Sequence, residues 1–185
     1  MKSAVVLPVT TASGPVRVTS PAPRAAWWQL AHADESALVS QTPTWLDSIC
    51  ATGPFTDASR LYEFEGGRRL VVPLARRRAR PAWLAAEESW PSDWGIGGPM
   101  MSPGVLDEAE ARLVFHDLAQ LPALRVAVRF GPGAHPAWAR AVPQSFRTED
   151  HMTQVVDLDG VRRNGRAGSD GRSVPLCLCT GSPRP

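Results

Sequence analysis

The segment 107–130 constrains the fold more than any other part of the sequence. Residues 107–121 predict an α-helix, because their apolar side chains recur at the spacing that places them on one helix face: Ala111, Val114, Phe115 and Leu118. Acidic residues fill the first turn, where the helix dipole favours negative charge, and Pro122 ends the helix. Residues 124–130 alternate apolar residues with arginines and predict a strand. A helix and a strand in such close succession indicate a mixed α/β domain, in the α+β sense of a mixed sheet with interleaved helices.

The first half of the chain supports this interpretation. A short strand is expected over 16–19, and the pairs Ser20-Pro21 and Thr42-Pro43 each predict a helix that begins at the proline. The second of these helices should end before Gly53. Two alternating runs, 61–65 and 70–74, flank Gly66-Gly67 and predict a β-hairpin.

The remaining segments give weaker signals. Residues 76–104 are rich in Arg, Trp, Gly and Pro and predict one long structured loop. A short helix is expected over 135–141, after the turn at Gly131-Pro132-Gly133, and a final strand over 152–158. A turn of this kind between strand and helix can bind an anion, but a plain turn is the favoured interpretation.

Charge divides the chain unevenly. Residues 160–185 contain five arginines and one aspartate, whereas residues 1–159 contain 15 basic and 17 acidic residues. The basic end has no apolar periodicity. We therefore expect a disordered leader over 1–15, a domain over 16–159 and a disordered basic tail over 160–185.

Composition excludes several classes of protein. No apolar run approaches the roughly 20 residues that would span a membrane, and the apolar stretch in 1–15 is too short for a signal peptide. Three cysteines do not make a disulfide framework, so a cytoplasmic location is expected. The pair Cys177 and Cys179 lacks a second ligand pair, so no metal site is expected. The four histidines are scattered and predict no catalytic constellation.

Two local strings suggest binding chemistry. Residues 94–99 are glycine-rich but lack the third glycine and the following helix of a dinucleotide fingerprint, so a structural loop that lines a cleft is favoured. Residues 76–80 contain four arginines beside Trp83, a combination able to bind phosphate or single-stranded nucleic acid. Their place directly after a strand in a mildly acidic body favours a solvated strand end instead, and no nucleic-acid partner is expected.

Several strings in a fixed order carry a family resemblance. They are Gln41-Thr42-Pro43-Thr44-Trp45-Leu46, Leu70-Val71-Val72-Pro73-Leu74-Ala75-Arg76-Arg77, Ser89-Trp90-Pro91-Ser92-Asp93-Trp94-Gly95-Ile96-Gly97-Gly98-Pro99 and Val155-Val156-Asp157-Leu158-Asp159-Gly160. Over residues 16–160 the chain resembles the first half of FemAB-like acyltransferases of the GNAT superfamily.

The resemblance implies an enzyme with two tandem GNAT-like domains that transfers an acyl group from acetyl-CoA, or another acyl-CoA, to a small-molecule amine. It implies that the second domain supplies most of the donor site, where backbone N–H groups at a strand-to-helix turn hold pyrophosphate. The first domain helps to form the cleft between them. On this basis we expect no cofactor to be bound by this half and no activity from this chain alone; the oligomeric state is left open.

After Gly160 the sequence departs from the family pattern, which continues with a second glycine, an aromatic residue and an Arg-rich amphipathic helix. We expect that the coding sequence is truncated or frameshifted near residue 160. Catalytic residues are not assigned, and the expected substrate-binding residues are Trp94, Gly97 and Arg129. The alternative is a non-catalytic binding or interaction module.

Overall fold

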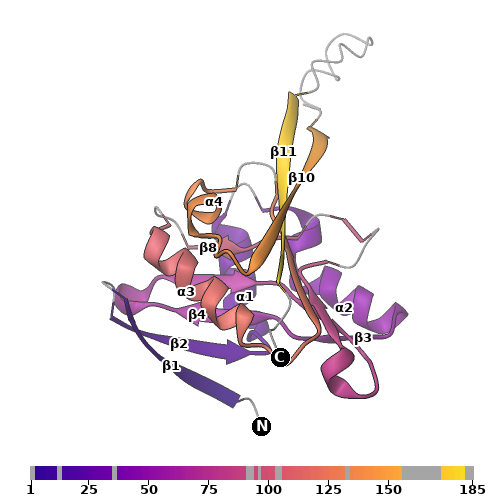
Figure 1. The fold of residues 1–185 in the computed structure, drawn as a ribbon, viewed down its shortest axis with the longest axis horizontal. Coiled ribbons are helices and arrows are strands. Elements are labelled where there is room, and N and C mark those ends of the chain that lie inside the picture. Colours follow the sequence, from indigo (N-terminus) through magenta and orange to yellow (C-terminus); the bar gives the residue numbers. More distant parts are fainter. Residues whose placement is uncertain are drawn as a thin grey trace.

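Two hydrogen-bonded sheets and the helices that cover them form the described part of the chain in this computed structural model (Figure 1). The structure describes residues 3–11, 14–34, 37–90, 94–95, 97–102, 106–131, 134–155 and 172–181. The elements are β1 (Ser3–Thr11), β2 (Gly14–Ser20), α1 (Arg24–Ala33), η1 (Val39–Gln41), α2 (Pro43–Thr52), β3 (Phe55–Asp57), β4 (Arg60–Glu63), η2 (Glu65–Gly67), β5 (Arg69–Val72), β6 (Ala75–Arg77), η3 (Ala82–Leu84), β7 (Ala86–Glu88), β8 (Met100–Met101), α3 (Glu108–Ala119), β9 (Arg125–Arg129), α4 (Ala137–Ala141), β10 (Phe146–Val155) and β11 (Arg172–Gly181).

The strand order is β1-β2-β4-β5-β8 in one sheet and β10-β11-β9-β7-β6-β3 in the other. Strands β7 and β9 run parallel, whereas the other strand pairs of the described chain are antiparallel. Helices together with a mixed sheet confirm the expected α/β class.

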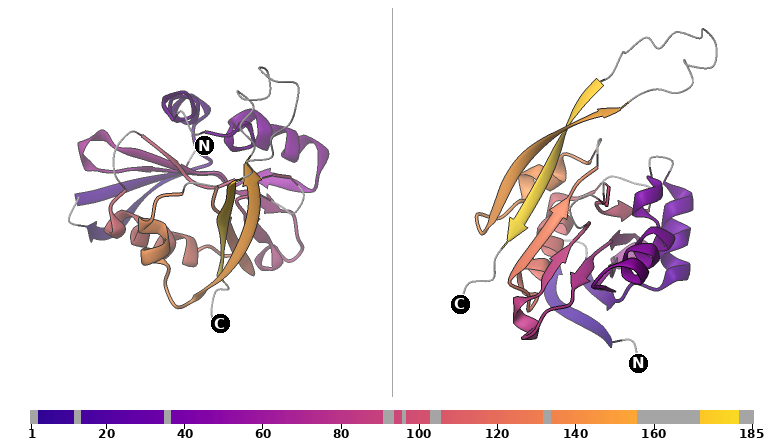
Figure 2. Two further views of the ribbon diagram at one scale, coloured as in Figure 1. Left: turned by 90° about the horizontal axis from the view of Figure 1, so that it is seen from above. Right: turned by 90° about the vertical axis from the view of Figure 1, so that its right-hand side faces the viewer.

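Helices cover both faces of the sheets. Helices α1 and α2 lie on one face and α3 and α4 on the other (Figure 2). Alternate residues of a strand point to opposite faces, so Leu61 and Val71 pack with α1 and α2, whereas Tyr62 and Leu70 pack with α3. The chain therefore has two apolar cores, one on each face.

The strongest local predictions are confirmed. Helix α3 is capped at Asp107, whose carboxylate accepts a hydrogen bond from the Ala109 N–H, and helix α2 begins at Pro43. The predicted hairpin is formed by β4 and β5 around Gly66 and Gly67, which both have positive φ angles. Such φ angles are open to glycine without steric cost, which explains the sequence of this turn.

The first helix begins later than predicted. The pair Ser20-Pro21 does not open it; α1 starts at Arg24. Ser20 belongs to β2, and the Ala22 N–H is bonded to both the carbonyl and the hydroxyl oxygen of Ser59, at 3.0 and 3.1 Å. This anchor to the segment before β4 keeps the backbone extended until Pro23.

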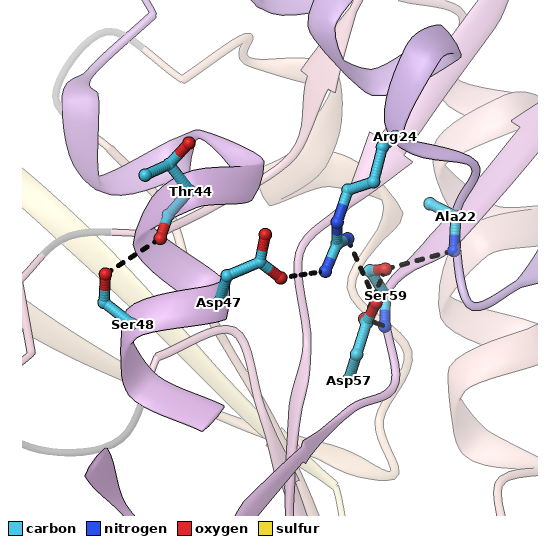
Figure 3. A network of polar contacts seen from close by, with 7 residues as sticks. All are labelled: Ala22, Arg24, Thr44, Asp47, Ser48, Asp57 and Ser59. Atoms are coloured by element: carbon cyan, nitrogen blue, oxygen red, sulfur yellow. Dashed lines mark hydrogen bonds and ion pairs between the residues drawn. The ribbon is translucent and has the colours of Figure 1, made fainter. Parts of the chain in front are cut away.

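Figure 3 shows how α1, α2 and β3 are joined. The Arg24 guanidinium lies between the carboxylates of Asp47 on α2 and Asp57 on β3 and forms an ion pair with each, 3.0 Å to Asp57. Asp57 also accepts hydrogen bonds from the backbone N–H and hydroxyl of Ser59, at 2.8 and 2.5 Å. The network fixes both helices over the bend that connects β3 to β4.

The prediction of one long loop over 76–104 is wrong. This segment contains the last residues of β6, all of β7 and all of β8. Strand β7 is only Ala86-Glu87-Glu88, and its buried residue is the glutamate Glu87, which pairs with Arg76. A three-residue polar strand has no alternating apolar signal, so the pattern does not reveal it.

The two ends of the chain also differ from expectation. Ser3–Thr11 form β1 and Arg172–Gly181 form β11, where an irregular leader and tail are expected. The last predicted strand is β10, which begins at Phe146 rather than at residue 152. Residues 156–171 and 182–185 of the expected tail lie outside the described residues, and the proposed domain boundaries stay a prediction. Among the described residues no helix has the length and apolar character needed to cross a membrane.

Candidate functional site

The candidate site lies at the carboxyl ends of β7 and β9. In open α/β sheets, ligands bind outside the carboxyl ends of parallel strands, where chain segments diverge. Ser89 and Trp90 follow β7, and Phe130 and Gly131 follow β9. The glycine-rich segment around Trp94–Gly98 lies against both, so residues far apart in sequence meet at this edge.

Two glycines make this close approach possible. A Cβ on Gly97 would lie 2.5 Å from Trp90 Cδ1 and 2.8 Å from the Ser89 carbonyl oxygen. A Cβ on Gly98, whose φ is +110°, would lie 2.9 Å from the Arg129 carbonyl oxygen. Side chains larger than hydrogen do not fit at either position without a shift of the neighbours. The two glycines therefore allow the loop to lie in close contact with the ends of β7 and β9.

Arg129 joins the two strands and the loop. Its backbone N–H donates a hydrogen bond to the buried hydroxyl of Ser89, at 2.7 Å. Its guanidinium is half-buried and donates to the Gly95 carbonyl oxygen at 3.3 Å. The remaining N–H groups of the guanidinium are able to meet a carboxylate or carbonyl oxygen of a ligand.

The other side of the loop is held by η1 and α2. The indole N–H of Trp45 donates to the Trp94 carbonyl oxygen at 2.8 Å, and the Gln41 amide donates to the Gly98 carbonyl oxygen at 3.2 Å. Gln41 is in turn fixed by Trp27, whose indole N–H donates to its carbonyl oxygen at 2.9 Å. These bonds pre-organise the loop.

The three expected residues lie on or beside this loop: Arg129 is bonded to the Gly95 carbonyl, Gly97 lies against Ser89 and Trp90, and Trp94 packs partly buried against the core under α1 and α2. Sequence reasoning missed the supporting residues Gln41 and Ser89, although both lie in the strings that carry the family resemblance. Nothing in the spacing of a lone Gln and a lone Ser marks them as supports. Their role depends on contacts across 57 and 40 positions of the chain.

One buried donor at the site is unpaired. Trp90 is 2% exposed, and its indole nitrogen has no hydrogen-bond partner among the described residues. The same nitrogen would lie 2.7 Å from a Cβ on Gly97, which places it under the loop. A buried donor without a partner costs about 1–3 kcal/mol.

The chemistry of this site is that of binding and orientation. Its donors include the Arg129 guanidinium and the Trp90 indole, and the hydroxyl of Ser89 is bonded to the Arg129 backbone. Among the described residues, no group of three His, Cys, Asp or Glu side chains could hold a metal ion. The donors of the described residues suit the binding and positioning of a polar ligand.

The electrostatics at the N-terminus of α3, the helix that follows β8, oppose anion binding. The carboxylate of Asp107 accepts from the Ala109 N–H at 3.1 Å, and that of Glu110 accepts from the Asp107 N–H at 3.0 Å. Glu110 is also paired with Arg68 at 2.9 Å. Two carboxylates thus occupy the helix N-terminus, where a pyrophosphate would otherwise be favoured. Residues 103–105, between β8 and α3, lie outside the described residues.

A buried charged network connects α3 to the sheet below it. Asp117, which is 4% exposed, accepts hydrogen bonds from the Arg60 Nε and Nη2 atoms at 2.6 and 2.8 Å and from the Tyr62 hydroxyl at 2.6 Å. Burial, together with the negative charge of Asp117, raises the pKa of Tyr62 well above its usual value. Burial likewise raises the pKa of Glu87, although Arg76 at 2.6 Å opposes the shift. These groups fix the fold and do not reach the candidate site.

Comparisons with protein-family models, with curated proteins and with solved structures found no match for this chain. A functional proposal therefore depends on the chain's own residues. The most informative of these are the segments that converge at the carboxyl ends of β7 and β9.

Proposed function

We propose that this chain is the first, acceptor-side domain of a FemAB-like N-acyltransferase of the GNAT superfamily. Such an enzyme transfers an acyl group from an acyl-CoA to the amine of a small molecule. The observation that supports the proposal is the approach of the loop residues Gly95, Gly97 and Gly98 to Arg129 and to the carboxyl ends of the parallel strands β7 and β9. Trp94 and Gly97 come from a string that carries the resemblance, whereas Arg129 lies outside those strings.

The chain's own contribution would be to hold the acceptor. The half-buried Arg129 would bind a carboxylate or carbonyl oxygen of the amine substrate through charge-assisted hydrogen bonds. The hydrogen bonds from Gln41 and Trp45 keep the loop in place before substrate arrives. Correct orientation of an amine toward a thioester carbonyl accounts for a large share of the rate in such a transfer.

The N-terminus of α3 does not suit the pyrophosphate of an acyl-CoA. The N-terminus of α3 carries Asp107 and Glu110, which would repel a pyrophosphate. We therefore derive no step at a donor site here, and a second GNAT-like half would supply it. Oxyanion stabilisation and release of the thiol would then also belong to that half.

The first experiment is calorimetry of the chain with acetyl-CoA, for which we expect no saturable binding. Sequencing of the gene beyond residue 160 should then reveal a second GNAT-like half in another frame. The restored protein joins residues 1–160 to that second half in one reading frame. Its expression should give transfer from acetyl-CoA to a panel of amines, measured as free CoA thiol. Micromolar binding of acetyl-CoA by the present chain would contradict the assignment of the donor site, and the absence of transfer would contradict the proposed enzyme.

Arg129 has a matched control on its own strand. Arg125 has the same charge, lies on the same face of β9 and forms a surface ion pair with Glu88 at 3.2 Å. In the restored protein, Arg129→Gln should lower kcat/KM about tenfold or more, which corresponds to a lost charge-assisted hydrogen bond. Arg125→Gln should leave it unchanged. Equal effects of the two variants would remove Arg129 from the site.

A non-catalytic binding module is the second candidate. The donors of the site, the Arg129 guanidinium and the Trp90 indole, would serve such a module equally well, because they can hold a ligand without a reaction that follows. On this alternative, the restored protein would bind amines in calorimetry without releasing CoA. The transfer assay therefore distinguishes the two candidates directly.

A further inference from the structure

Arginines are four of the seven residues that line a hollow beside β6. It has a volume of about 420 Å³, which is within the range of sites for small ligands. Its lining residues are Thr56, Arg76, Arg77, Arg78, Ala79, Arg80 and Ala85. Four arginines close together in sequence therefore line one space.

The backbone explains why arginines so close in sequence share one hollow. In a continuous strand, alternate side chains would point to opposite faces. Here β6 ends at Arg77, and the Arg78 N–H continues the pairing with the residues before β3 by donating to the Pro54 carbonyl oxygen at 2.8 Å. The chain then bends at Arg80 before η3, and residues of β6 and of this bend line the same hollow.

Most of this positive charge is not neutralised. Arg76 forms an ion pair with Glu87 at 2.6 Å. Arg78 donates to the Phe55 carbonyl oxygen at 3.0 Å, which is an uncharged acceptor. In the described part of the chain, Arg77, Arg78 and Arg80 form no ion pair. Three exposed like charges around one hollow repel one another, and a multiply charged anion would relieve that repulsion.

We infer that this hollow binds a small ligand that carries two or more phosphate groups, held by Arg77, Arg78 and Arg80. The planar guanidinium matches the geometry of phosphate oxygens and can form two parallel hydrogen bonds to them. Three such groups exceed what a single phosphate requires. The hollow borders Ala85, before β7, whereas the candidate acceptor site follows β7, so the inference is independent of the proposed function.

The surroundings favour a small ligand over nucleic acid. Binding of a single strand needs a charged groove and several aromatic side chains for successive bases. In the described part of the chain, one strongly exposed aromatic residue, Trp83 at 61%, lies near the hollow in sequence. Residues 1–159 also contain more acidic than basic residues, which opposes a long polyanion.

The test is calorimetry of the intact chain with inorganic pyrophosphate at fixed ionic strength. A triple variant, R77Q/R78Q/R80Q, is compared with R17Q/R112Q/R140Q, which removes the same charge from exposed positions elsewhere. We expect saturable binding to one site, weakened about tenfold or more by the first variant and less than about twofold by the second.

Three results would overturn the inference. They are the absence of saturable pyrophosphate binding, equal losses in the two triple variants, and binding of a single-stranded oligonucleotide more than about tenfold tighter than pyrophosphate. Thermal unfolding monitors folding of each variant. Should the first triple variant not fold, R77Q and R80Q replace it as single changes, since neither guanidinium is bonded to a described residue.

Discussion

Replacement of Asp117 by Asn tests the network that joins α3 to β4. The substitution keeps the shape of the side chain but replaces one of its two acceptor oxygens with a donor. Three hydrogen bonds converge on these oxygens, two from Arg60 and one from Tyr62. In the variant, a donor of Arg60 or Tyr62 must face the new amide N–H, and the Arg60 charge loses its counter-charge in the interior.

The expected cost is large because the pair is buried. Side-chain exposure is 12% for Arg60 and 5% for Asp117. Breaking a buried ion pair by removing one partner costs about 3–5 kcal/mol. For a chain of this size, that corresponds to a fall of about 6–20 °C in the midpoint of thermal unfolding. Urea unfolding followed by tryptophan fluorescence measures the free energy directly.

An exposed ion pair on the same helix provides the control. Arg112 and Glu108 lie four residues apart, with Arg112 65% exposed, and their pair at 2.5 Å should contribute only about 0.3–0.5 kcal/mol. Arg112→Gln should therefore change stability by a small fraction of the Asp117→Asn effect. Equal effects of the two variants would refute the reasoning that burial sets the magnitude.

A second variant keeps the test decisive if Asp117→Asn does not fold. The triple change Arg60→Met, Tyr62→Phe and Asp117→Leu removes every polar member of the network at once. Replacing a buried ion pair by apolar residues of similar volume is often neutral or stabilising. We therefore expect this protein to unfold at a denaturant concentration near that of the wild type.

Three further predictions follow from the same contacts. Tyr62 is the single tyrosine of the chain, so tyrosinate absorbance should stay absent in the native protein above pH 10 and appear only on unfolding; a native titration near pH 10 would contradict its burial. Because the pKa of Glu87 is raised in the folded state, the folded protein keeps a proton on this carboxyl above pH 4.5, where the unfolded chain releases it. The free energy of unfolding that Glu87 contributes is therefore highest at low pH and falls as the pH rises through the raised pKa. The stability of wild type relative to Glu87→Gln should therefore decline from pH 4.5 to neutral pH in urea unfolding, and an increase would show the opposite sign. Gly97→Ala should cost about 1–3 kcal/mol, because its Cβ would overlap Trp90 Cδ1 at 2.5 Å, whereas Gly66→Ala meets no atom within 4 Å and pays only for its positive φ.

The elements that sequence reasoning found are those with local physical causes. Thr42-Pro43 opens α2 because proline has the φ of a first helical residue and lacks the N–H that would be unpaired there. Gly66-Gly67 closes the hairpin because both residues have positive φ. Neither signal depends on distant parts of the chain.

The elements that it missed depend on distant partners. Strand β7 is polar and short, and it is held by pairing with β6 on one side and β9 on the other. Its buried Glu87 is compatible with the interior only because Arg76 is 2.6 Å away. No property of Ala86-Glu87-Glu88 by itself indicates a strand.

The candidate site likewise combines features with local causes and features that depend on distant parts of the chain. The amino-acid sequence by itself determined the capped helix α3, the hairpin and the unusual glycine-rich and arginine-rich strings, because spacing and backbone preference are local properties. Only the tertiary structure decided that Gly97 and Gly98 lie in close contact with the ends of β7 and β9, and that four arginines line one hollow. Those arrangements arise from strand pairing and chain reversal between segments distant in sequence, which no local pattern encodes.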